Sequence, residues 1–434
     1  MKKNVMRVTA VMIAVAIVAL CLAGCTACGG ASAGKYDWPR WRGPNGDGIS
    51  RETGWNPKAL EGGPRIAWQV NVGAGYSSVA IRGNRLYTMG WPLEADSSVY
   101  CLDASSGKEL WQYPVKGMFP QATPAVDGSS VYCLGKGGIL LCLDAGDGKL
   151  RWEKNLVAEY DVVKPAYGFA GSPVVVGNLL ILTANTSGIA LDKNTGERAW
   201  VSERPPKTVS YGDSSGTEYH TPVIYAKNRK RYAIVSSWKG VFSVEVETGK
   251  PFLLFDWEES YFLFRSQIVD PVVVGDKVLV VGPQKKDPGT FLLDMQGQGV
   301  KVLWKSEGTF AELGSPIFFD GHFYVSQGGG DMNGSLRCID PKTGKVEWEE
   351  FLGGGLGHES VLFTVADGKL IVLNDKGMLS IAEASPEGFH VLSSCNVLAG
   401  KKQLKRFWTS PVLCNGMIYC RDLDGDLICI DVRK

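Results

Sequence analysis

The fold is decided by the stretch CLDASSGKELW at residues 101–111, because the same pattern returns along the chain. An apolar run ends in Leu-Asp or Ile-Asp, a turn follows that contains Gly and then Lys or Glu, and the next run closes on a tryptophan. The pattern recurs at residues 142–152, 190–200 and 338–348, and the Trp always stands four positions after the turn Gly. Two short apolar runs precede each copy, so one cycle holds four strands in about 46 residues.

Eight such cycles follow one another, and most of them open on a Ser/Thr-Pro step. Strand signals bounded by Gly, Asn and Asp recur so regularly that long helices have no room. We therefore predict an all-β fold, an eight-bladed β-propeller of four-stranded antiparallel blades over residues 65–434. The opening steps begin at Ser77, Thr123, Ser172, Thr221, Asp270, Ser315, Glu359 and Ser410.

The two ends of the repeat predict how the ring closes. The eighth cycle stops at Lys434 before any outer strand, whereas residues 65–72 form an outer-strand pattern of their own with Trp68. We expect this N-terminal strand to complete the last blade, because closure removes the exposed edges of an open array.

Composition excludes one class of function. The chain has 46 Lys plus Arg against 45 Asp plus Glu, and no long run of one sign. A nucleic-acid-binding protein would carry a basic patch or stripe. We therefore expect no nucleic-acid partner.

The first residues have the layout of a secretory leader. Basic residues precede an uncharged apolar run at residues 8–23, which is shorter than the roughly twenty residues of a spanning helix. The run ends in Leu-Ala-Gly-Cys25 and resembles the bacterial lipobox, whose cysteine receives lipid. We expect a lipoprotein signal peptide at 1–24 and a lipidated tether and N-terminal extension at 25–64. The alternative is an ordinary signal or uncleaved anchor in which Cys25 is incidental.

The repeat of Leu-Asp, Thr-Gly-Lys and Trp is similar over residues 65–434 to that of the pyrroloquinoline-quinone (PQQ) enzymes and their non-enzymatic relatives. Within this family the chain resembles the outer-membrane-assembly lipoprotein BamB and related exported single-propeller proteins. The segment WPRWRGP at residues 38–44 also resembles an opening seen in many exported propellers.

The resemblance implies a non-catalytic scaffold anchored by lipid in the bacterial cell envelope, in the outer membrane facing the periplasm. Its expected partners are envelope proteins such as the outer-membrane assembly machinery, and no cofactor is expected. The alternative is a PQQ- or small-ligand-binding propeller, with calcium, that acts as a quinoprotein oxidoreductase. Against it, the chain lacks the adjacent cysteine pair common in those dehydrogenases, and their calcium ligands cannot be placed on it.

Polar residues near the opening steps suggest a ligand site at the mouth of the central channel. Inner strands line that channel, and the residue before each step includes His220 and His358. Asp270 and Glu359 stand where other cycles have Ser or Thr. Imidazole and carboxylate groups suit transition metals, so these four residues could hold a cation or a small polar ligand. The sequence does not identify the metal. The alternative is that channel residues are wet and tolerate polarity without function.

Aromatic and Arg residues near the channel mouths are candidates for a protein interface, because such side chains often anchor interfaces. The alternative is that they pack between blades. The candidates are Tyr219, Tyr261, Phe262, Phe264, Arg265 and Trp408.

Two pairs of cysteines flank predicted hairpin turns. If a two-residue Gly-Gly or Asp-Gly turn closes each hairpin, the paired residues face each other with Cα atoms about 4.5 Å apart. That separation lies at the lower end of disulfide geometry, and an exported compartment permits oxidation. The alternative is that cysteine serves as a small buried apolar residue. The pairs are Cys133 with Cys142 and Cys420 with Cys429.

Overall fold

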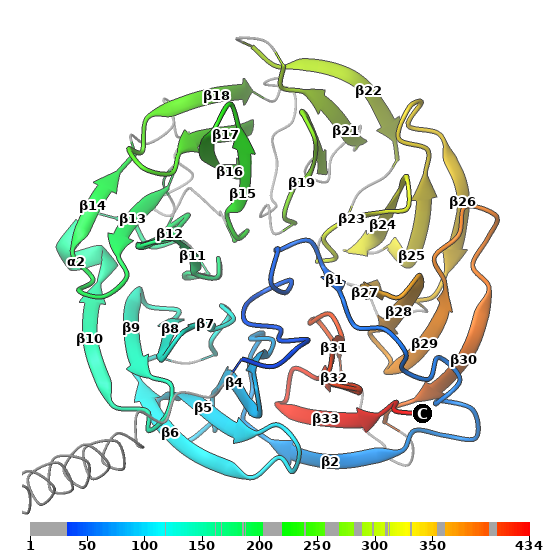
Figure 1. Ribbon diagram of the computed structural model, residues 1–434, viewed down its shortest axis with the longest axis horizontal. Helices are drawn as coiled ribbons and strands as arrows, with labels where there is room; N and C mark the ends of the chain where they lie inside the picture. Colours follow the sequence, from blue (N-terminus) through cyan, green and yellow to red (C-terminus); the bar gives the residue numbers. More distant parts are fainter. Residues whose placement is uncertain are drawn as a thin grey trace, which may run out of the picture.

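Eight blades of four antiparallel strands stand around a central axis in the computed structural model, and one blade is extended by a fifth strand (Figure 1). It describes residues 33–434 except 118, 161, 166, 185, 187, 203–218, 238–239, 257–268, 282–288, 297–298, 309–310, 312, 330–331, 354–360 and 399–405. The predicted eight-bladed antiparallel propeller is confirmed. In blades 1 to 7 the four antiparallel strands follow the chain from the axis outward.

The blades are numbered in chain order. Blade 1 contains β3 (Ala80–Arg82), β4 (Arg85–Gly90), β5 (Ser97–Asp103) and β6 (Glu109–Val115). Blade 2 contains β7 (Ala125–Asp127), β8 (Ser130–Leu134), β9 (Ile139–Asp144) and β10 (Leu150–Asn155). Blade 3 contains β11 (Val174–Val176), β12 (Leu179–Leu182), β13 (Ile189–Asp192) and β14 (Arg198–Val201). Blade 4 contains β15 (Val223–Lys227), β16 (Lys230–Ser237), β17 (Gly240–Glu245) and β18 (Pro251–Asp256). Blade 5 contains β19 (Val272–Val274), β20 (Lys277–Val281), β21 (Gly289–Asp294) and β22 (Lys301–Glu307). Blade 6 contains β23 (Ile317–Phe319), β24 (His322–Gly329), β25 (Met332–Ile339) and β26 (Val346–Phe351). Blade 7 contains β27 (Val361–Ala366), β28 (Lys369–Asn374), β29 (Met378–Glu383), β30 (Val391–Asn396), and blade 8 contains β31 (Val412–Cys414), β32 (Met417–Arg421) and β33 (Asp426–Asp431).

The ring closes as predicted. Strand β2 (Ile66–Asn71) pairs antiparallel with β33 and becomes the outer strand of blade 8. The first strand of the propeller is therefore bonded to its last, and no blade is left incomplete at the seam. Strand β1 (Ile49–Ser50) adds to blade 7, parallel to β27. A short helix, α2 (Leu156–Tyr160), follows β10. No helix within the described residues is long and apolar enough to span a membrane.

The repeated tryptophans join a blade to the next one at six of the eight seams. Trp111 of blade 1 lies over the turn of blade 2, where its indole Nε1 donates to the Ala145 carbonyl at 3.3 Å. A Cβ atom on Gly148 in that turn would fall 2.7 Å from the Trp111 ring. The turn glycine is therefore needed to receive the tryptophan of the preceding blade. Equivalent indole bonds join Trp68 to Ala104, Trp152 to Lys193, Trp200 to Val246, Trp304 to Pro341 and Trp348 to Ser385.

Two seams use other residues in place of this tryptophan. Between blades 4 and 5, the Lys227 ammonium donates to the Met295 carbonyl, which holds the position equivalent to Ala145. Between blades 7 and 8, Trp55 and Leu60 of the N-terminal segment enter the shared core and are 4% and 0% exposed. The seam of blades 4 and 5 is thus filled by a residue of the repeat itself, whereas the seam of blades 7 and 8 is filled by residues of the N-terminal segment.

The predicted cysteine pairs are wrong by one residue of register. Cys133 lies opposite Leu141, and Cys142 lies opposite Tyr132. The same shift places Cys420 opposite Ile428. The connections are longer than two residues, and a shift of one residue turns a side chain to the other face of the sheet. All four thiols are free and buried, which supports the alternative of a small apolar residue.

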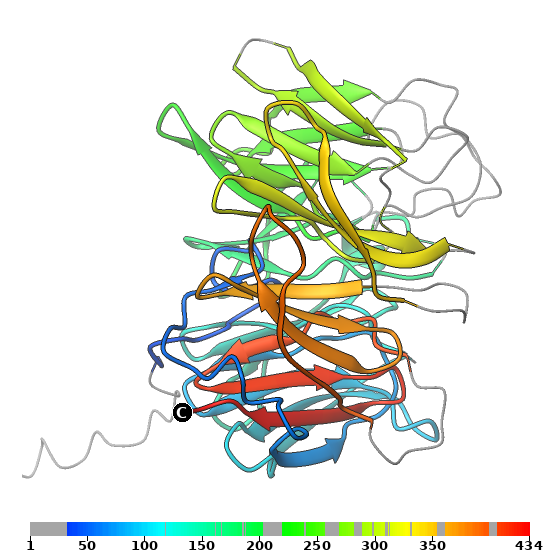
Figure 2. The same ribbon diagram turned by 90° about the vertical axis from the view of Figure 1, so that its right-hand side faces the viewer.

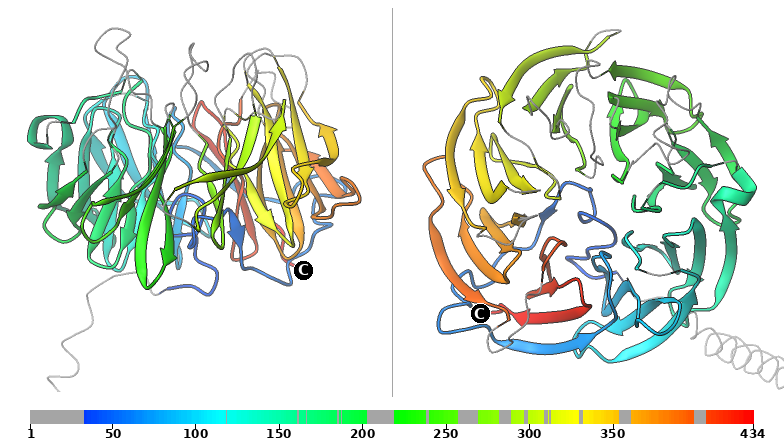
Figure 3. Two further views of the ribbon diagram at one scale, coloured as in Figure 1. Left: turned by 90° about the horizontal axis from the view of Figure 1, so that it is seen from above. Right: turned by 180° about the vertical axis from the view of Figure 1, so that it is seen from behind.

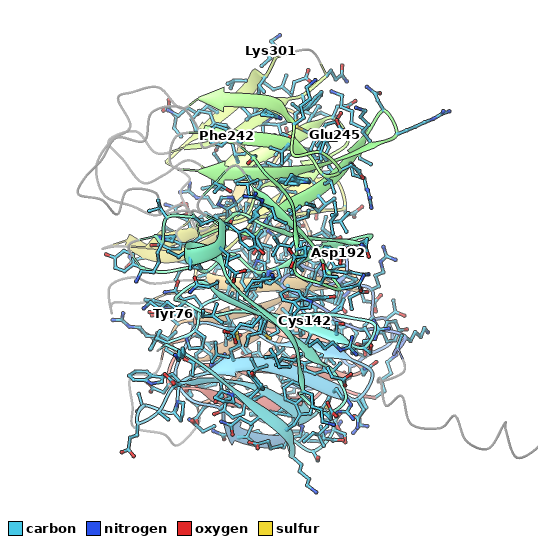
Figure 4. All side chains as sticks on the ribbon, turned by 90° about the vertical axis from the view of Figure 1, so that its left-hand side faces the viewer. Tyr76, Cys142, Asp192, Phe242, Glu245 and Lys301 are labelled. Carbon is cyan, nitrogen blue, oxygen red and sulfur yellow. The ribbon has the colours of Figure 1, made fainter. Side chains whose placement is uncertain are left out.

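The connections define two faces of the ring. The turns between the first and second strands and between the third and fourth strands form one face, here called the turn face. The other connections form the loop face. Residues 33–65, here called the strap, lie on the turn face and pass near the axis before reaching β2 (Figures 2 and 3). Figure 4 places Tyr76 on the opposite side from Asp192 and Glu245, which end third strands.

Candidate functional site

The opening residues of successive blades are linked by hydrogen bonds around the channel. The Ser78 amide donates to Thr123 Oγ1 at 3.0 Å, and the Thr123 amide donates to Ser172 Oγ at 2.9 Å. The Ser172 amide continues the series to Thr221 Oγ1 at 3.0 Å. This belt explains the Ser/Thr preference, because each hydroxyl satisfies a buried amide of the preceding blade.

Asp270 takes part in the belt and also binds the strap. Its Oδ1 accepts the Thr221 amide at 2.8 Å, as a hydroxyl would. Its Oδ2 accepts the indole Nε1 of Trp41 at 2.7 Å and lies 3.8 Å from Arg42 Nη1. Asp270 is only 2% exposed, and this burial raises its pKa, while Arg42, Thr221 and Trp41 act in the opposite direction. The carboxylate is therefore committed to protein contacts.

The strap is bonded to the inner strands of blades on both sides of the axis. Trp38 forms an antiparallel bridge with Ile81 of β3, and the Pro39 carbonyl accepts the Val126 amide of β7 at 2.8 Å. On the other side, the Arg42 guanidinium donates to the Pro316 carbonyl at 2.5 Å. The strap thus covers the centre of the turn face, where Figure 1 shows it inside the ring.

The predicted metal or ligand set is not assembled by the described residues. His220 is 1% exposed, and desolvation lowers its pKa to about 3, so its ring is neutral near pH 7. Asp270 faces the strap. His358 and Glu359 lie outside the described residues. Over the part of the chain that the structure describes, no three His, Cys, Asp or Glu side chains are grouped to hold a metal.

A group of aromatic residues, here called the aromatic cluster, lies at the loop face near the seam of blades 8, 1 and 2. The rings of Tyr76 and Trp408 are stacked with centroids 5.2 Å apart and planes at 11°. Phe119 meets the Tyr76 ring edge-on at 4.7 Å, and Trp91 lies 6.3 Å from Phe119. All four residues are partly exposed.

Backbone strain accompanies the aromatic cluster. Phe119 has a φ of 57°, which bulky residues seldom adopt and which costs about 1–3 kcal/mol. Lys136 lies over the same ring at 6.0 Å, within cation–π range. Strain of this kind tends to be kept where it positions a binding side chain.

The predicted interface residues have different positions. Trp408 belongs to the aromatic cluster, where its ring stacks on Tyr76. Tyr219 is 6% exposed, and its hydroxyl accepts the Tyr167 amide at 3.0 Å, so it supports Tyr167, which is 65% exposed. Burial raises the pKa of Tyr219 to about 12. The remaining candidates, Tyr261, Phe262, Phe264 and Arg265, lie outside the described residues.

Sequence reasoning missed the other members of the aromatic cluster. Tyr76 precedes the first opening step and could have been found by the rule that singled out His220, had that rule counted aromatic residues. Trp91 and Phe119 lie in irregular connections and follow no repeat, so no pattern marked them.

Comparisons with known proteins agree with this architecture. The family model described as outer membrane protein assembly factor BamB matches residues 62–156 and 95–350. The BamB protein of Burkholderia pseudomallei is 27% identical over 300 residues, which is 65% of this chain and 68% of that protein.

Solved structures show the same fold at low identity. BamB from Moraxella catarrhalis aligns with a TM-score of 0.59 and 16% identity, covering 84% of this chain and 97% of that one. Quinohemoprotein alcohol dehydrogenase from Comamonas testosteroni aligns with a TM-score of 0.66 and 14% identity, covering 93% and 82%. The fold is therefore shared by assembly factors and by enzymes, and it does not separate them.

Proposed function

Because this chain belongs to the family described as outer membrane protein assembly factor BamB, we propose that it is a non-catalytic scaffold of the bacterial cell envelope. Its partners would be envelope proteins, the outer-membrane assembly machinery first among them. Lipid on Cys25 would hold it at the outer membrane, facing the periplasm. Cys25 lies outside the described residues, so this anchor rests on the sequence pattern.

The observation that supports the proposal is the contrast between the two faces. On the side of the turn face, the strap enters the channel, where Trp41 and Arg42 occupy the carboxylate of Asp270. On the loop face, stacked and partly exposed aromatic rings stand beside a lysine. Large rigid aromatic groups at the centre of a patch are typical anchors of protein interfaces.

The test is recovery of partners from the envelope of the protein's own organism. The tagged, lipidated protein is crosslinked, solubilised and purified, and its partners are identified by mass spectrometry. We expect an outer-membrane assembly component to co-purify, and its yield to fall at least tenfold for Trp408→Ala. Phe351→Ala, which removes a 63% exposed aromatic from an outer strand, is the matched control. Equal recovery of the partner with Trp408→Ala and with Phe351→Ala would show that the aromatic cluster is not part of the interface.

A second candidate function is binding of a planar ligand such as PQQ. It is favoured by the Tyr76–Trp408 stack and by the fold shared with a quinohemoprotein dehydrogenase. Its calcium requirement does not fit Asp270, because both carboxylate oxygens already accept hydrogen bonds from Thr221 and Trp41. Addition of PQQ and calcium, followed by dye reduction and by the melting temperature, tests this function. No change in either quantity would exclude it.

A further inference from the structure

The chain reaches the propeller on the turn face. The Gly34 amide donates to Asp37 Oδ2 at 3.0 Å, and Asp37 Oδ1 accepts the amide of Gly83 at 2.8 Å. Gly83 lies in the inner turn of blade 1. Cys414, at the inner turn of blade 8, donates to the Tyr36 carbonyl at 3.1 Å. The strap is thus fastened to the turn face at the point where it begins.

The rest of the strap holds that position. Trp38, Arg42, Trp55 and Leu60 are each buried, at exposures between 0% and 7%. Release of the strap would expose three large apolar side chains and a guanidinium that lies beside Asp270. The strap therefore acts as a fixed part of the ring and does not lengthen the tether.

The tether that remains is short. Seven residues, 26–32, separate Cys25 from the first described residue, Ala33. A fully extended chain of this length, counted from Cys25 to Ala33, spans at most about 28 Å. To bring the loop face to the membrane, it would first have to cross about 14 Å from the inner turns to the rim, which is three strand spacings of about 4.8 Å. It would then have to run along a blade whose strands are about 20 Å long. The tether is too short for that path.

The exposed charges of this region are mainly positive. Within residues 33–66 and 431–434, a single acidic side chain, Glu61, is exposed. Six basic side chains are exposed in the same segments, and a surface of this sign is complementary to anionic lipid headgroups. They are Lys35, Arg51, Lys58, Arg65, Arg433 and Lys434.

We propose that the strap orients the propeller, with its turn face held against an anionic lipid surface and its loop face directed away from the membrane. This inference rests on the anchoring through Cys25 that is part of the proposed function. It adds an interaction surface on the turn face, and it leaves the aromatic cluster free to meet partners away from the bilayer.

Fluorescence quenching by nitroxide lipids tests the orientation. The mature lipidated protein is inserted into vesicles of phosphatidylethanolamine and phosphatidylglycerol in equal amounts. A fluorophore is attached at Thr53→Cys on the strap or at Leu93→Cys on the loop face, both of which are exposed positions. All variants carry Cys28→Ser, which removes the thiol of the tether, and the eight native cysteines that the structure describes are buried. Protein with Cys28→Ser alone measures the labelling of those eight. We expect at least threefold stronger quenching at Thr53→Cys, and equal or reversed quenching would overturn the proposal.

A second measurement tests the charged surface without the lipid. Protein expressed without residues 1–25, and so without the apolar leader and the lipidated cysteine, is sedimented with the same vesicles and with phosphatidylcholine vesicles. We expect binding only to the anionic vesicles, weakened by salt and at least tenfold weaker for the triple variant Lys35→Glu, Arg51→Glu, Lys58→Glu. The matched control is the triple variant Lys116→Glu, Lys164→Glu, Lys376→Glu, three exposed positions on the loop face. An equal loss of binding in this control would show that the positive charges of the turn face do not form the lipid-binding surface.

The outcomes separate this inference from the proposed function. Asymmetric quenching without a co-purified partner would support the orientation and reject the scaffold. A partner that binds through the aromatic cluster, combined with symmetric quenching, would do the reverse. A mature protein whose mass shows no lipid on Cys25 would overturn the orientation.

Discussion

Replacement of Asp270 by serine tests whether its carboxylate locks the strap into the ring. Serine is the residue that blades 3 and 6 use at the same step, and its hydroxyl can still accept the Thr221 amide. It cannot reach the strap as the carboxylate does, so the bond from Trp41 Nε1 and the ion pair with Arg42 are lost. Asp270→Ser therefore separates the belt from the strap lock.

The expected magnitude follows from the burial of the partner. Arg42 is 7% exposed, and removal of one member of a buried ion pair costs about 3–5 kcal/mol because the other charge is left uncompensated. The Trp41 hydrogen bond to a charged group contributes about 1.5–3 kcal/mol, but both contacts share one oxygen and do not add. Arg42 keeps its bond to the Pro316 carbonyl. We expect Asp270→Ser to lower the free energy of unfolding by about 3 kcal/mol.

The assay combines the urea midpoint of unfolding with limited trypsin digestion. Release of the strap exposes the Arg40 and Arg42 peptide bonds, so Asp270→Ser should be cleaved there well before the propeller is degraded. The double variant Asp270→Ser, Arg42→Met removes the uncompensated charge and should recover part of the loss. A stability of Asp270→Ser within about 0.5 kcal/mol of wild type, with an unchanged digestion pattern, would refute the lock.

Three other predictions concern the ring. Gly148→Ala should lower the free energy of unfolding in urea by about 1–3 kcal/mol more than Gly128→Ala does. Both glycines have positive φ, but a Cβ atom meets the Trp111 ring only at Gly148. Equal losses would show that the contact between Gly148 and Trp111 does not stabilise the seam. His220 stays neutral in the folded protein down to a pKa of about 3, whereas in the unfolded chain it gains a proton below about pH 6.5. Stability should therefore fall by about 1.4 kcal/mol per pH unit below 6.5, and His220→Gln should lack this part of a urea-midpoint profile. The hydrogen bond from Arg433 holds the pKa of Asp431 well below its usual range, so its contribution to ring closure is present above about pH 4 and is lost as pH falls further; Asp431→Asn should abolish this part of the acid sensitivity of melting.

The repeat was predictable because its signals are local. Leu-Asp, the turn glycine and the tryptophan recur with fixed spacing, and the unpaired strand with Trp68 indicated where the ring closes. The cysteine pairing was not predictable, because it depends on turn length. One extra residue in the turn turns Cys133 and Cys142 to opposite faces of blade 2.

The sequence by itself determined that four-stranded units repeat eight times and that the N-terminal strand completes the last one, because hydrophobic alternation and turn residues act within a few positions. Only the tertiary structure decided what the conspicuous residues contact. At five of the described turns the glycine receives the tryptophan of the preceding blade, as Gly148 receives Trp111. The carboxylate of Asp270 binds Trp41, 229 positions earlier in the chain. Such contacts form between residues that the closed ring brings together, and the spacing of residues along the chain does not predict them.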